Sequence, residues 1–378
     1  MEMDIIKIAI CVSLLLLTVA SSLCSVFFRR ITHTIPSDNQ NTLPKISIVI
    51  AAHDSAVYLQ KNLPYFLSQV YYPGFEVIVV DESSTDNTND VLTLLKTKYA
   101  NLYTTFIPTS SKYLSRRKLA LTIGVKAAHN EWIIFSDADC RPNSDNWLYS
   151  FSQFCNDNYN IIMGYTQFDA DTKSFYRFER MQASWQMFNK ALKGTAYRHC
   201  GANLAIRKSD FIKHNGFLKN LKYLRGEYDF IVNEYAARGC TAIVTSKDAF
   251  MIQDNPFAKT WLNTHLSYIE TRKHLKRSFA YRFTFNMDMI MLYLNYIVQI
   301  STLAYSIYAN NIALVATAAF CILTAIMLRV SIAKKACTFL NENISAFKIP
   351  FMEIGILWNN IRLLIKYMTA DKYDFIRK

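Results

Sequence analysis

Two long stretches without a charged residue constrain this chain more than any other feature. The first runs for 21 residues from Ile8 to Phe28, and the second for 40 residues from Met289 to Leu328. A helix of about 20 apolar residues is long enough to cross a bilayer. The sequence therefore predicts a membrane protein, in which the second stretch has room for two spans.

We place the spans near residues 5–28, 288–309 and 312–329, with Asn310 and Asn311 forming the turn between the last two. The alternative for the second stretch is a buried helical hairpin of a soluble domain. A cleaved signal peptide is the alternative for the first. It is not favoured, because no A-x-A cleavage site follows the apolar stretch.

Basic residues collect mainly on one side of the predicted spans, and the other end of the first span carries only Lys7, beside Glu2 and Asp4. They follow the first span, precede the second and follow the third: Arg29, Arg30, Arg272, Lys273, Lys276, Arg277, Arg282, Arg329, Lys334 and Lys335. Lys and Arg collect on the cytoplasmic side of membrane proteins. We therefore expect a multi-pass protein of the cell (inner) membrane whose globular part, from residue 29 to about 286, is cytoplasmic.

The net charge of +13 suits an anionic partner, such as a nucleic acid, a lipid head group or a phosphorylated substrate. Residues 259–282 hold six Lys or Arg against Glu270 alone, beside a predicted span. We read them as a segment on anionic lipid and expect no nucleic acid, because no nucleic-acid motif accompanies the charge. Residues 331–378 mix apolar and basic residues, which favours an amphipathic helix lying on the membrane.

Short apolar β-branched runs alternate with helical patterns from residue 45 to about 164. This alternation predicts an α/β fold with a doubly wound, mostly parallel sheet, which binds ligands at the carboxyl ends of its strands. The predicted strands are Ile46–Ala51, Phe75–Val80, Tyr103–Ile107 and Trp132–Phe135, and the predicted helices are Tyr58–Gln69, Thr88–Tyr99 and Ser115–Ala128.

Acidic residues follow two of these strands. Asp81 and Glu82 come after one, and Asp137 and Asp139 after another. An Asp-x-Asp pair at a strand end can hold a hard divalent cation whose other ligands are phosphate oxygens. Asp81 and Glu82 can accept hydrogen bonds from a base or a ribose. The alternative is that both clusters only cap turns and helices.

Four ordered segments resemble glycosyltransferase family 2, whose members are inverting enzymes with the GT-A (Rossmann-like) fold and use nucleotide-diphosphate sugars. The segments are Pro44–Asp54, Val79–Thr88, Lys118–Leu121 and Ser136–Asp139. The resemblance covers about residues 44–255.

The resemblance implies a role for each matching residue. Those lining the nucleotide-sugar pocket would be Ala51, Asp54, Asp81, Glu82 and Asp137, with Lys118 near the phosphates. Asp137 and Asp139 would hold Mg²⁺ or Mn²⁺ at the diphosphate, with Asp139 favoured as the direct ligand. Such a metal neutralises charge that develops on the leaving diphosphate.

Two later segments resemble the acceptor side of the family. Gly201, Ala202 and Asn203 match a segment whose small residues admit the sugar, although an ordinary strand start gives the same pattern. Residues 226–231 are similar to the family's G-E-D-x-D-L segment, at the start of a helix expected to run to residue 237 and end at a glycine C-cap, Gly239.

An inverting transfer needs one carboxylate to take the proton of the acceptor hydroxyl. The segment departs from the family at this point, because a gapless alignment puts Tyr228 where the second acid is usual. We favour Asp229 as the base, with Glu227 second; loss of the base is the third alternative. No Q-x-x-R-W motif is present, so a long polymerising channel is not expected.

The sequence thus predicts a membrane-anchored glycosyltransferase with five segments. They are an anchor and linker (1–43), the GT-A domain (44–255), a basic interface segment (256–287), a transmembrane hairpin (288–330) and an interfacial tail (331–378). The acceptor would be a hydroxyl near the bilayer, on a lipid-linked oligosaccharide, a glycolipid or a surface polysaccharide precursor. The alternatives are a nucleotidyltransferase or sugar-phosphate transferase on a similar fold, and an inactive membrane scaffold; no motif specifies the sugar, the linkage or the oligomeric state.

Overall fold

The computed structural model describes residues 2–32, 34, 43–111 and 115–376, which form two compact units. A helical unit comprises residues 1–30 and 277–362, and a globular unit comprises residues 31–276 and 363–378. Residues 363–376 are thus grouped with the globular unit, and the boundary at residues 276–277 falls within the predicted interface segment.

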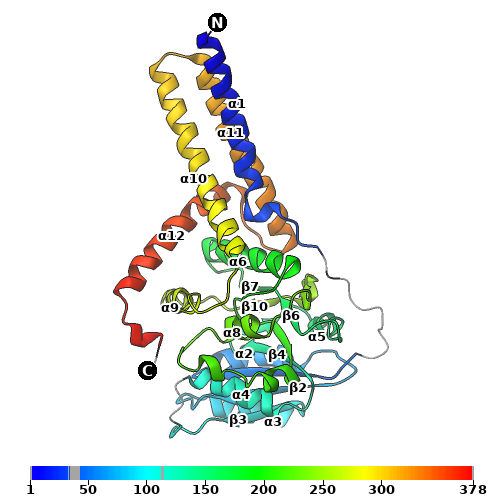
Figure 1. Ribbon diagram of the computed structural model, residues 1–378. Helices are drawn as coiled ribbons and strands as arrows, with labels where there is room; N and C mark the ends of the chain where they lie inside the picture. Colours follow the sequence, from blue (N-terminus) through cyan, green and yellow to red (C-terminus); the bar gives the residue numbers. More distant parts are fainter. Residues whose placement is uncertain (1, 33, 35–42, 112–114, 377–378) are drawn as a thin grey trace. The chain divides into compact units, whose positions relative to one another are not determined.

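Three helices of the helical unit are long and apolar enough to cross a membrane, as the sequence predicts (Figure 1). They are α1 (Glu2–Leu23), α10 (Phe279–Tyr308) and α11 (Ile312–Phe339), and the fourth helix, α12 (Ile349–Thr369), continues into the globular unit. The turn between α10 and α11 lies at the predicted asparagine pair. Asn310 has a left-handed φ of 50°, and the Asn311 side chain accepts the N–H of Leu314 to cap α11.

Helix α11 extends ten residues beyond the predicted end of the third span, because the charge at Arg329 is neutralised inside the helical unit. Its guanidinium, 1% exposed, donates to Asp288 on α10 at 2.9 Å, to Glu353 on α12 at 2.9 Å and to the carbonyl of Ser21 on α1 at 2.9 Å. Removing one partner of such a buried pair costs about 3–5 kcal/mol. The end of α1, the first part of α10 and the later part of α11 therefore lie side by side at this cluster. One span followed by a hairpin of two spans has this arrangement.

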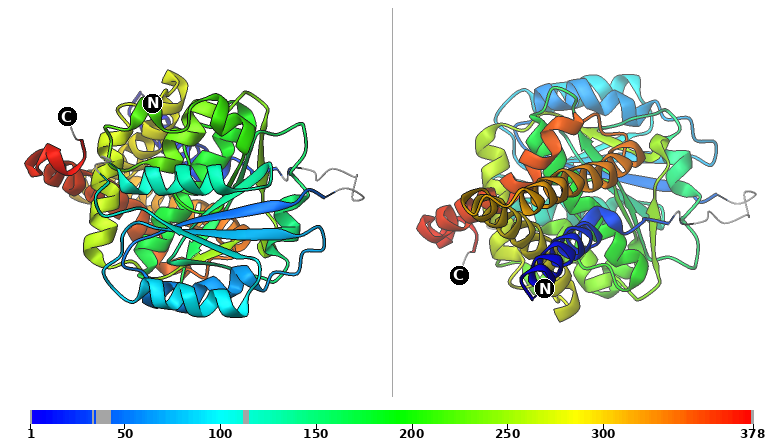
Figure 2. Two further views of the ribbon diagram at one scale, coloured as in Figure 1. Left: turned by 90° about the horizontal axis from the view of Figure 1, so that it is seen from below. Right: turned by 90° about the horizontal axis from the view of Figure 1, so that it is seen from above.

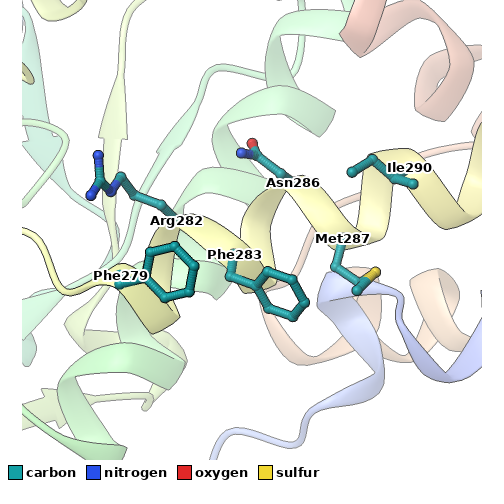
Figure 3. A pocket seen from close by; sticks show the side chains of 6 residues that line it. All are labelled: Phe279, Arg282, Phe283, Asn286, Met287 and Ile290. Atoms are coloured by element: carbon teal, nitrogen blue, oxygen red, sulfur yellow. The ribbon is translucent and has the colours of Figure 1, made fainter.

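A hollow of about 350 Å³ lies along the first half of α10 (Figure 3). Phenyl, thioether and aliphatic side chains make up most of its lining, which consists of Phe279, Arg282, Phe283, Asn286, Met287 and Ile290. The residues that form this lining include no carboxylate, histidine or cysteine.

The globular unit is built on a seven-stranded sheet with the order β3-β2-β1-β4-β8-β6-β9, and a small sheet with the order β5-β10-β7. The first four strands are parallel, and β8 is antiparallel to both of its neighbours. Helices cover both faces of the main sheet (Figure 2), which confirms the mostly parallel α/β fold. The strands are β1 (Ile46–Ala52), β2 (Phe75–Asp81), β3 (Leu102–Phe106), β4 (Trp132–Asp137), β5 (Cys140–Pro142), β6 (Ile161–Gly164), β7 (Thr166–Phe168), β8 (Leu204–Arg207), β9 (Thr241–Val244) and β10 (Met251–Gln253).

The helices of this unit lie where the sequence predicts them as far as β4. They are α2 (Ala56–Leu67), α3 (Thr88–Lys98), α4 (Arg116–Ala127), α5 (Trp147–Ser152), α6 (Ser174–Lys193), α7 (Lys208–Lys213), α8 (Glu227–Tyr235) and α9 (Ala258–Thr271). Helix α8 ends two residues earlier than predicted. Its C-cap is Ala236 with extended backbone, so Gly239, at φ 78°, belongs to the turn before β9 rather than to the helix end.

The core explains why β1 is apolar at every position except Ser47, whose hydroxyl donates to Glu76. Every residue of β1 is buried, as expected for a parallel strand with helices on both faces. Helix α4 packs directly on this strand, because a Cβ on Gly124 would lie 2.4 Å from Cγ1 of Val49. A helix that returns the chain between parallel strands begins at their carboxyl ends, so the arginines that begin α4 lie at the rim where the site forms.

Candidate active site

Strand register sets the positions of the acidic residues. In β1, Ala52 pairs with Asp81 of β2, and Ala51 pairs with Asp137 of β4. The two aspartates therefore flank the end of β1 at one rim, as predicted. Ala51, 2% exposed, forms part of the floor between them.

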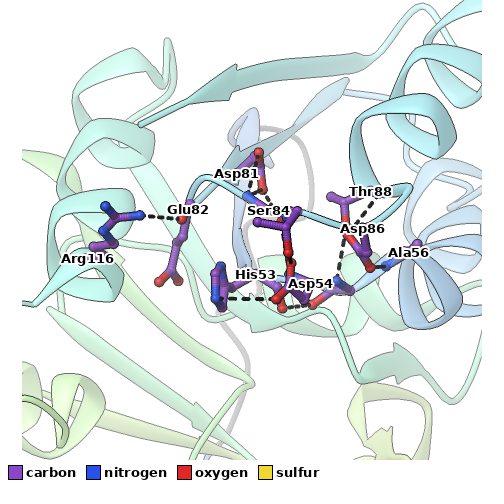
Figure 4. A network of polar contacts seen from close by, with 11 residues as sticks. His53, Asp54, Ala56, Asp81, Glu82, Ser84, Asp86, Thr88 and Arg116 are labelled. Carbon is purple, nitrogen blue, oxygen red and sulfur yellow. Dashed lines mark hydrogen bonds and ion pairs between the residues drawn. The ribbon is translucent and has the colours of Figure 1, made fainter. Parts of the chain in front are cut away.

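Carboxylates hold the loops after β1 and β2 against each other (Figure 4). Asp54, at a left-handed φ of 45°, accepts the Thr85 N–H at 2.7 Å, and this bond is the largest cause that lowers its pKa. Asp86 accepts the Ala56 N–H at 3.0 Å across the two loops, while Asp81 accepts the Ser84 N–H at 3.1 Å within its own loop. These bonds preorganise the loops where the resemblance expects the nucleotide.

Glu82 follows Asp81 and is buried at the same rim. Its N–H donates to the carbonyl of Ala52 at 2.7 Å, and its own carbonyl accepts from Arg116 at 3.3 Å. Burial raises the pKa of its carboxyl, and the positive charge of Arg117 opposes that rise. The side chain thus stands beside the acidic groups without a charged partner in direct contact among the described residues.

The Asp-x-Asp motif forms a compact set of oxygen ligands. Carboxylate oxygens of Asp137 and Asp139 and the Cys140 sulfur lie within 4.8 Å of one another. Asp139 also accepts from Nε2 of Gln253, on β10, at 2.9 Å. Two carboxylates at this spacing fit a hard cation such as Mg²⁺ or Mn²⁺. The Cys140 thiol is a soft ligand and suits such a cation less well.

Arg117 is a site residue that the sequence analysis missed. It forms an ion pair with Asp137, and its Nη2 lies 3.4 Å from the hydroxyl of Tyr228. The Tyr228 hydroxyl in turn donates to Asp137. The residue that replaces the family's second acid therefore contacts the metal motif. Arg117 directly precedes the basic residue singled out from the sequence, and that adjacency was the available signal.

Lys118 lies elsewhere. It is fully buried, and its ammonium donates to the carbonyl oxygens of Asn220 and Tyr223, each at 2.7 Å. Burial lowers its pKa to about 8. Adjacent residues of a helix point about 100° apart, so only one of this basic pair reaches the acidic cluster. We therefore assign Lys118 to the loop at residues 220–223 rather than to the phosphates.

Glu227 and Asp229, the two acids proposed as the base, have different surroundings. Asp229 is paired with Arg198 at 3.0 Å, and the Arg198 guanidinium lies 3.6 Å from the ring centre of Tyr268. Burial raises the pKa of Asp229, and Arg198 opposes the rise. Glu227 is also buried, but its Oε1 has no hydrogen-bond partner in the described part of the chain, while its Oε2 lies 3.9 Å from Arg117.

Residues 201–203, which we expected to face the acceptor, are partly buried in the core. The Asn203 amide accepts from Trp147 at 3.1 Å and donates to the carbonyls of Tyr165 at 3.0 Å and Ala249 at 2.9 Å. These bonds use both of its N–H groups, so Asn203 holds the scaffold together rather than offering them to a sugar. Ala202 is buried, whereas Gly201 is partly exposed and has space for a Cβ.

Comparison with known proteins decides the family of this domain. Residues 47–214 match the family described as "Glycosyl transferase family 2". The globular unit contains a family 2 glycosyltransferase domain. The part of this domain that matches includes the rim carboxylates and Arg117, but ends before Glu227.

The family 2 domain is similar to two curated proteins over about 109 residues. "Probable glycosyltransferase YdaM" of Bacillus subtilis is 32% identical, over 28% of this chain and 25% of its own length. Glycosyltransferase AglE of Haloferax volcanii is 30% identical, over 29% of this chain and 34% of its own length. The chain thus spans a quarter to about a third of the length of these relatives.

A solved structure shares the GT-A fold of the family 2 domain. Mannosyltransferase PcManGT from Pyrobaculum calidifontis, in complex with GDP-Man and Mn²⁺, superposes with a TM-score of 0.53 at 13% identity. The match covers 85% of this chain and 98% of that one.

Proposed function

We propose that this protein transfers a sugar from a nucleotide-diphosphate sugar to an acceptor hydroxyl, with inversion and with the help of a divalent metal. The observation that carries the proposal is the pair Asp137 and Asp139 at the end of β4, with Arg117 and a buried, incompletely bonded Glu227 beside it. Carboxylates for a metal, a cation for phosphate and a base then share one rim.

The donor would bind along the loops after β1 and β2, with base and ribose against Asp54, Asp81 and Glu82. Its diphosphate would lie at Asp137 and Asp139. A Mg²⁺ or Mn²⁺ bound there supplies positive charge to the leaving diphosphate. Arg117 is the protein's own cation at this position and adds charge-assisted hydrogen bonds to the phosphate oxygens.

We assign the base to Glu227 rather than to Asp229. The acceptor oxygen attacks the anomeric carbon from the face opposite the diphosphate, its proton passes to Glu227, and the bond to the diphosphate breaks with its electron pair. Asp229 is less suited because the Arg198 guanidinium donates to its carboxylate at 3.0 Å and so occupies an oxygen that would have to accept the proton. One displacement needs no covalent intermediate.

We further propose that the acceptor is presented at the bilayer, on a lipid-linked oligosaccharide, a glycolipid or a surface polysaccharide precursor. Three candidate spans in the same chain support a membrane-proximal acceptor. Basic residues follow the first candidate span, precede the second and follow the third. This distribution favours the inner membrane with a cytoplasmic catalytic domain.

The test is release of nucleoside diphosphate by the full-length protein in detergent. GDP-mannose, UDP-glucose and UDP-N-acetylglucosamine would be supplied with Mn²⁺ and a lipid extract as the source of acceptor. We expect release with at least one donor, and a loss of at least roughly 100-fold in Asp139→Asn. The matched control is Asp157→Asn, at a fully exposed carboxylate that pairs with Arg207. Release that survives Asp139→Asn would refute the metal site, and pyrophosphate release would favour the nucleotidyltransferase alternative.

An inactive scaffold is the second candidate, and the substitution at Tyr228 favours it. For an inactive scaffold, we expect calorimetry to detect binding of a nucleotide sugar, and the release assay to detect no turnover of any donor.

A further inference from the structure

Residues 375 and 376 lie against the loop that leads to Glu227. Ile376 forms an antiparallel bridge with Tyr223, and the carbonyl of Phe375 accepts the N–H of Leu224 at 2.9 Å. We call residues 363–376 the C-terminal strap and residues 220–226 the acid loop. Both belong to the globular unit.

Side chains fix the strap to α9. Leu363 and Phe375 of the strap are buried in one apolar cluster, together with Trp261, Leu266 and Ile269 of α9. Beside the cluster, Tyr367 of the strap donates its hydroxyl to Glu270 and accepts from Lys273 at 2.5 Å. Burial in a cluster of this kind contributes roughly 1.5–3 kcal/mol per large side chain before entropy is counted. The strap is therefore a packed element and not a loose terminus.

The opposite edge of the acid loop is bound by α4, the helix that carries Arg117. The Lys118 ammonium holds the carbonyls of Asn220 and Tyr223, and the Ser115 hydroxyl donates to the carbonyl of Leu224 at 3.1 Å. The loop backbone is thus bonded on one side by α4 and on the other by the strap.

The loop then turns sharply into the acidic segment. Gly226 has a φ of 90°, and a Cβ there would lie 2.4 Å from Cγ2 of Thr271 on α9, so only glycine fits this close approach. Helix α8 begins at the next residue, Glu227. The ring of Tyr223 stacks on Phe230 of α8, with centroids 5.3 Å apart, and on His274, with centroids 4.3 Å apart. A shift of the loop backbone would therefore be passed to the start of α8.

We propose that the C-terminal strap positions Glu227 for catalysis by clamping the acid loop against α4. This inference rests on the proposed role of Glu227 as the base. The first part of the strap, residues 363–369, is the end of α12, and this helix begins in the helical unit. The segment that orders the acid is therefore covalently joined to the unit that holds the candidate spans. A misplacement of about 1 Å at a reacting group can cost 10²-fold in rate, so the strap need move the loop only slightly to matter.

Hydrogen exchange and kinetics on the full-length protein test the proposal. Phe375→Ala removes the packed ring, and a stop codon after Asp371 removes the bridging residues. The matched control is Tyr373→Ala, which changes an aromatic residue that is 57% exposed in the same segment. In both strap variants we expect the amides of residues 220–230 to exchange roughly tenfold faster, while those of β1 and β4 are unchanged. With the donor that the release assay identifies, we expect turnover of the strap variants to fall by at least roughly tenfold, while the KM for that donor stays unchanged.

Unchanged exchange at residues 220–230 in both variants would overturn the proposal. Faster exchange with unchanged turnover would also overturn it, since the strap would then hold the loop without positioning the acid. If the unaltered protein releases no nucleoside diphosphate from any donor, the proposed function fails. The exchange result then still decides whether the strap orders the acid loop.

Discussion

The two halves of the site differ in how far sequence and structure agree. On the proposed nucleotide side, Asp81 and Asp137 lie at the rim where the strand pattern puts them, because register with β1 fixes their positions. Asp54 follows β1 and is held there by the Thr85 N–H. On the acceptor side, Asn203 holds the core together and Asp229 is paired with Arg198. A parallel sheet thus determines the position of a motif residue. By contrast, the start of α8 after Gly226 does not determine whether Glu227 or Asp229 lacks an arginine in hydrogen-bond contact.

The assignment of the base gives the largest expected effect and the sharpest test of this difference. Glu227→Gln should lower turnover by about 10³-fold, because a positioned general base contributes 10²–10⁴-fold. Asp229→Asn should cost less, about tenfold, by loosening the Arg198 pair. Nucleoside diphosphate release measures both, and donor affinity by calorimetry should stay unchanged in each. A larger loss in Asp229→Asn than in Glu227→Gln would return the role to the residue that the sequence favours.

The adjacent basic residues of α4 give the next largest effect. Arg117→Met should lower turnover about 10²-fold, because it removes the cation beside Asp137. Lys118→Met should instead leave two loop carbonyls unpaired and destabilise the fold by roughly 1–3 kcal/mol. Thermal unfolding and steady-state kinetics of the two variants separate these roles. Equal loss of turnover at full thermal stability in Lys118→Met would contradict the separation.

A pH dependence of stability is expected on the proposed acceptor side. His199 faces the carbonyls of Gly201 and Gly164, and burial lowers its pKa to about 4 from an unfolded value near 6.5. The unfolded state takes up the proton first as pH falls. The contribution of neutral His199 to the free energy of unfolding is therefore complete above pH 6.5. It is lost as the pH falls from 6.5 to about 4, by up to about 3 kcal/mol.

Thermal unfolding across this pH range measures the effect. The slope should flatten in His199→Gln and persist in a control, His129→Gln, at an exposed position. A slope that is the same in both variants would show that the imidazole of His199 does not titrate with unfolding.

Most of the fold could be predicted because its signals are local. The run Ile46–Ala51 indicates a buried strand by itself, and the uncharged stretches indicate spans by their length. What could not be predicted depends on partners far along the chain. The charge at Arg329 ended the predicted span, since nothing near it in sequence shows that Asp288 and Glu353 neutralise it. Likewise, no local pattern pairs Arg198 with Asp229.

The ion cluster around Arg329 has a consequence for biosynthesis. Asp288 precedes Arg329 by 41 residues, and Glu353 follows it by 24. When the ribosome delivers α11, one counter-ion has already been made and the second is still to come. A nascent chain halted before residue 353 would hold Arg329 with only one of its two carboxylate partners, so this charge is fully paired only after α12 has been made.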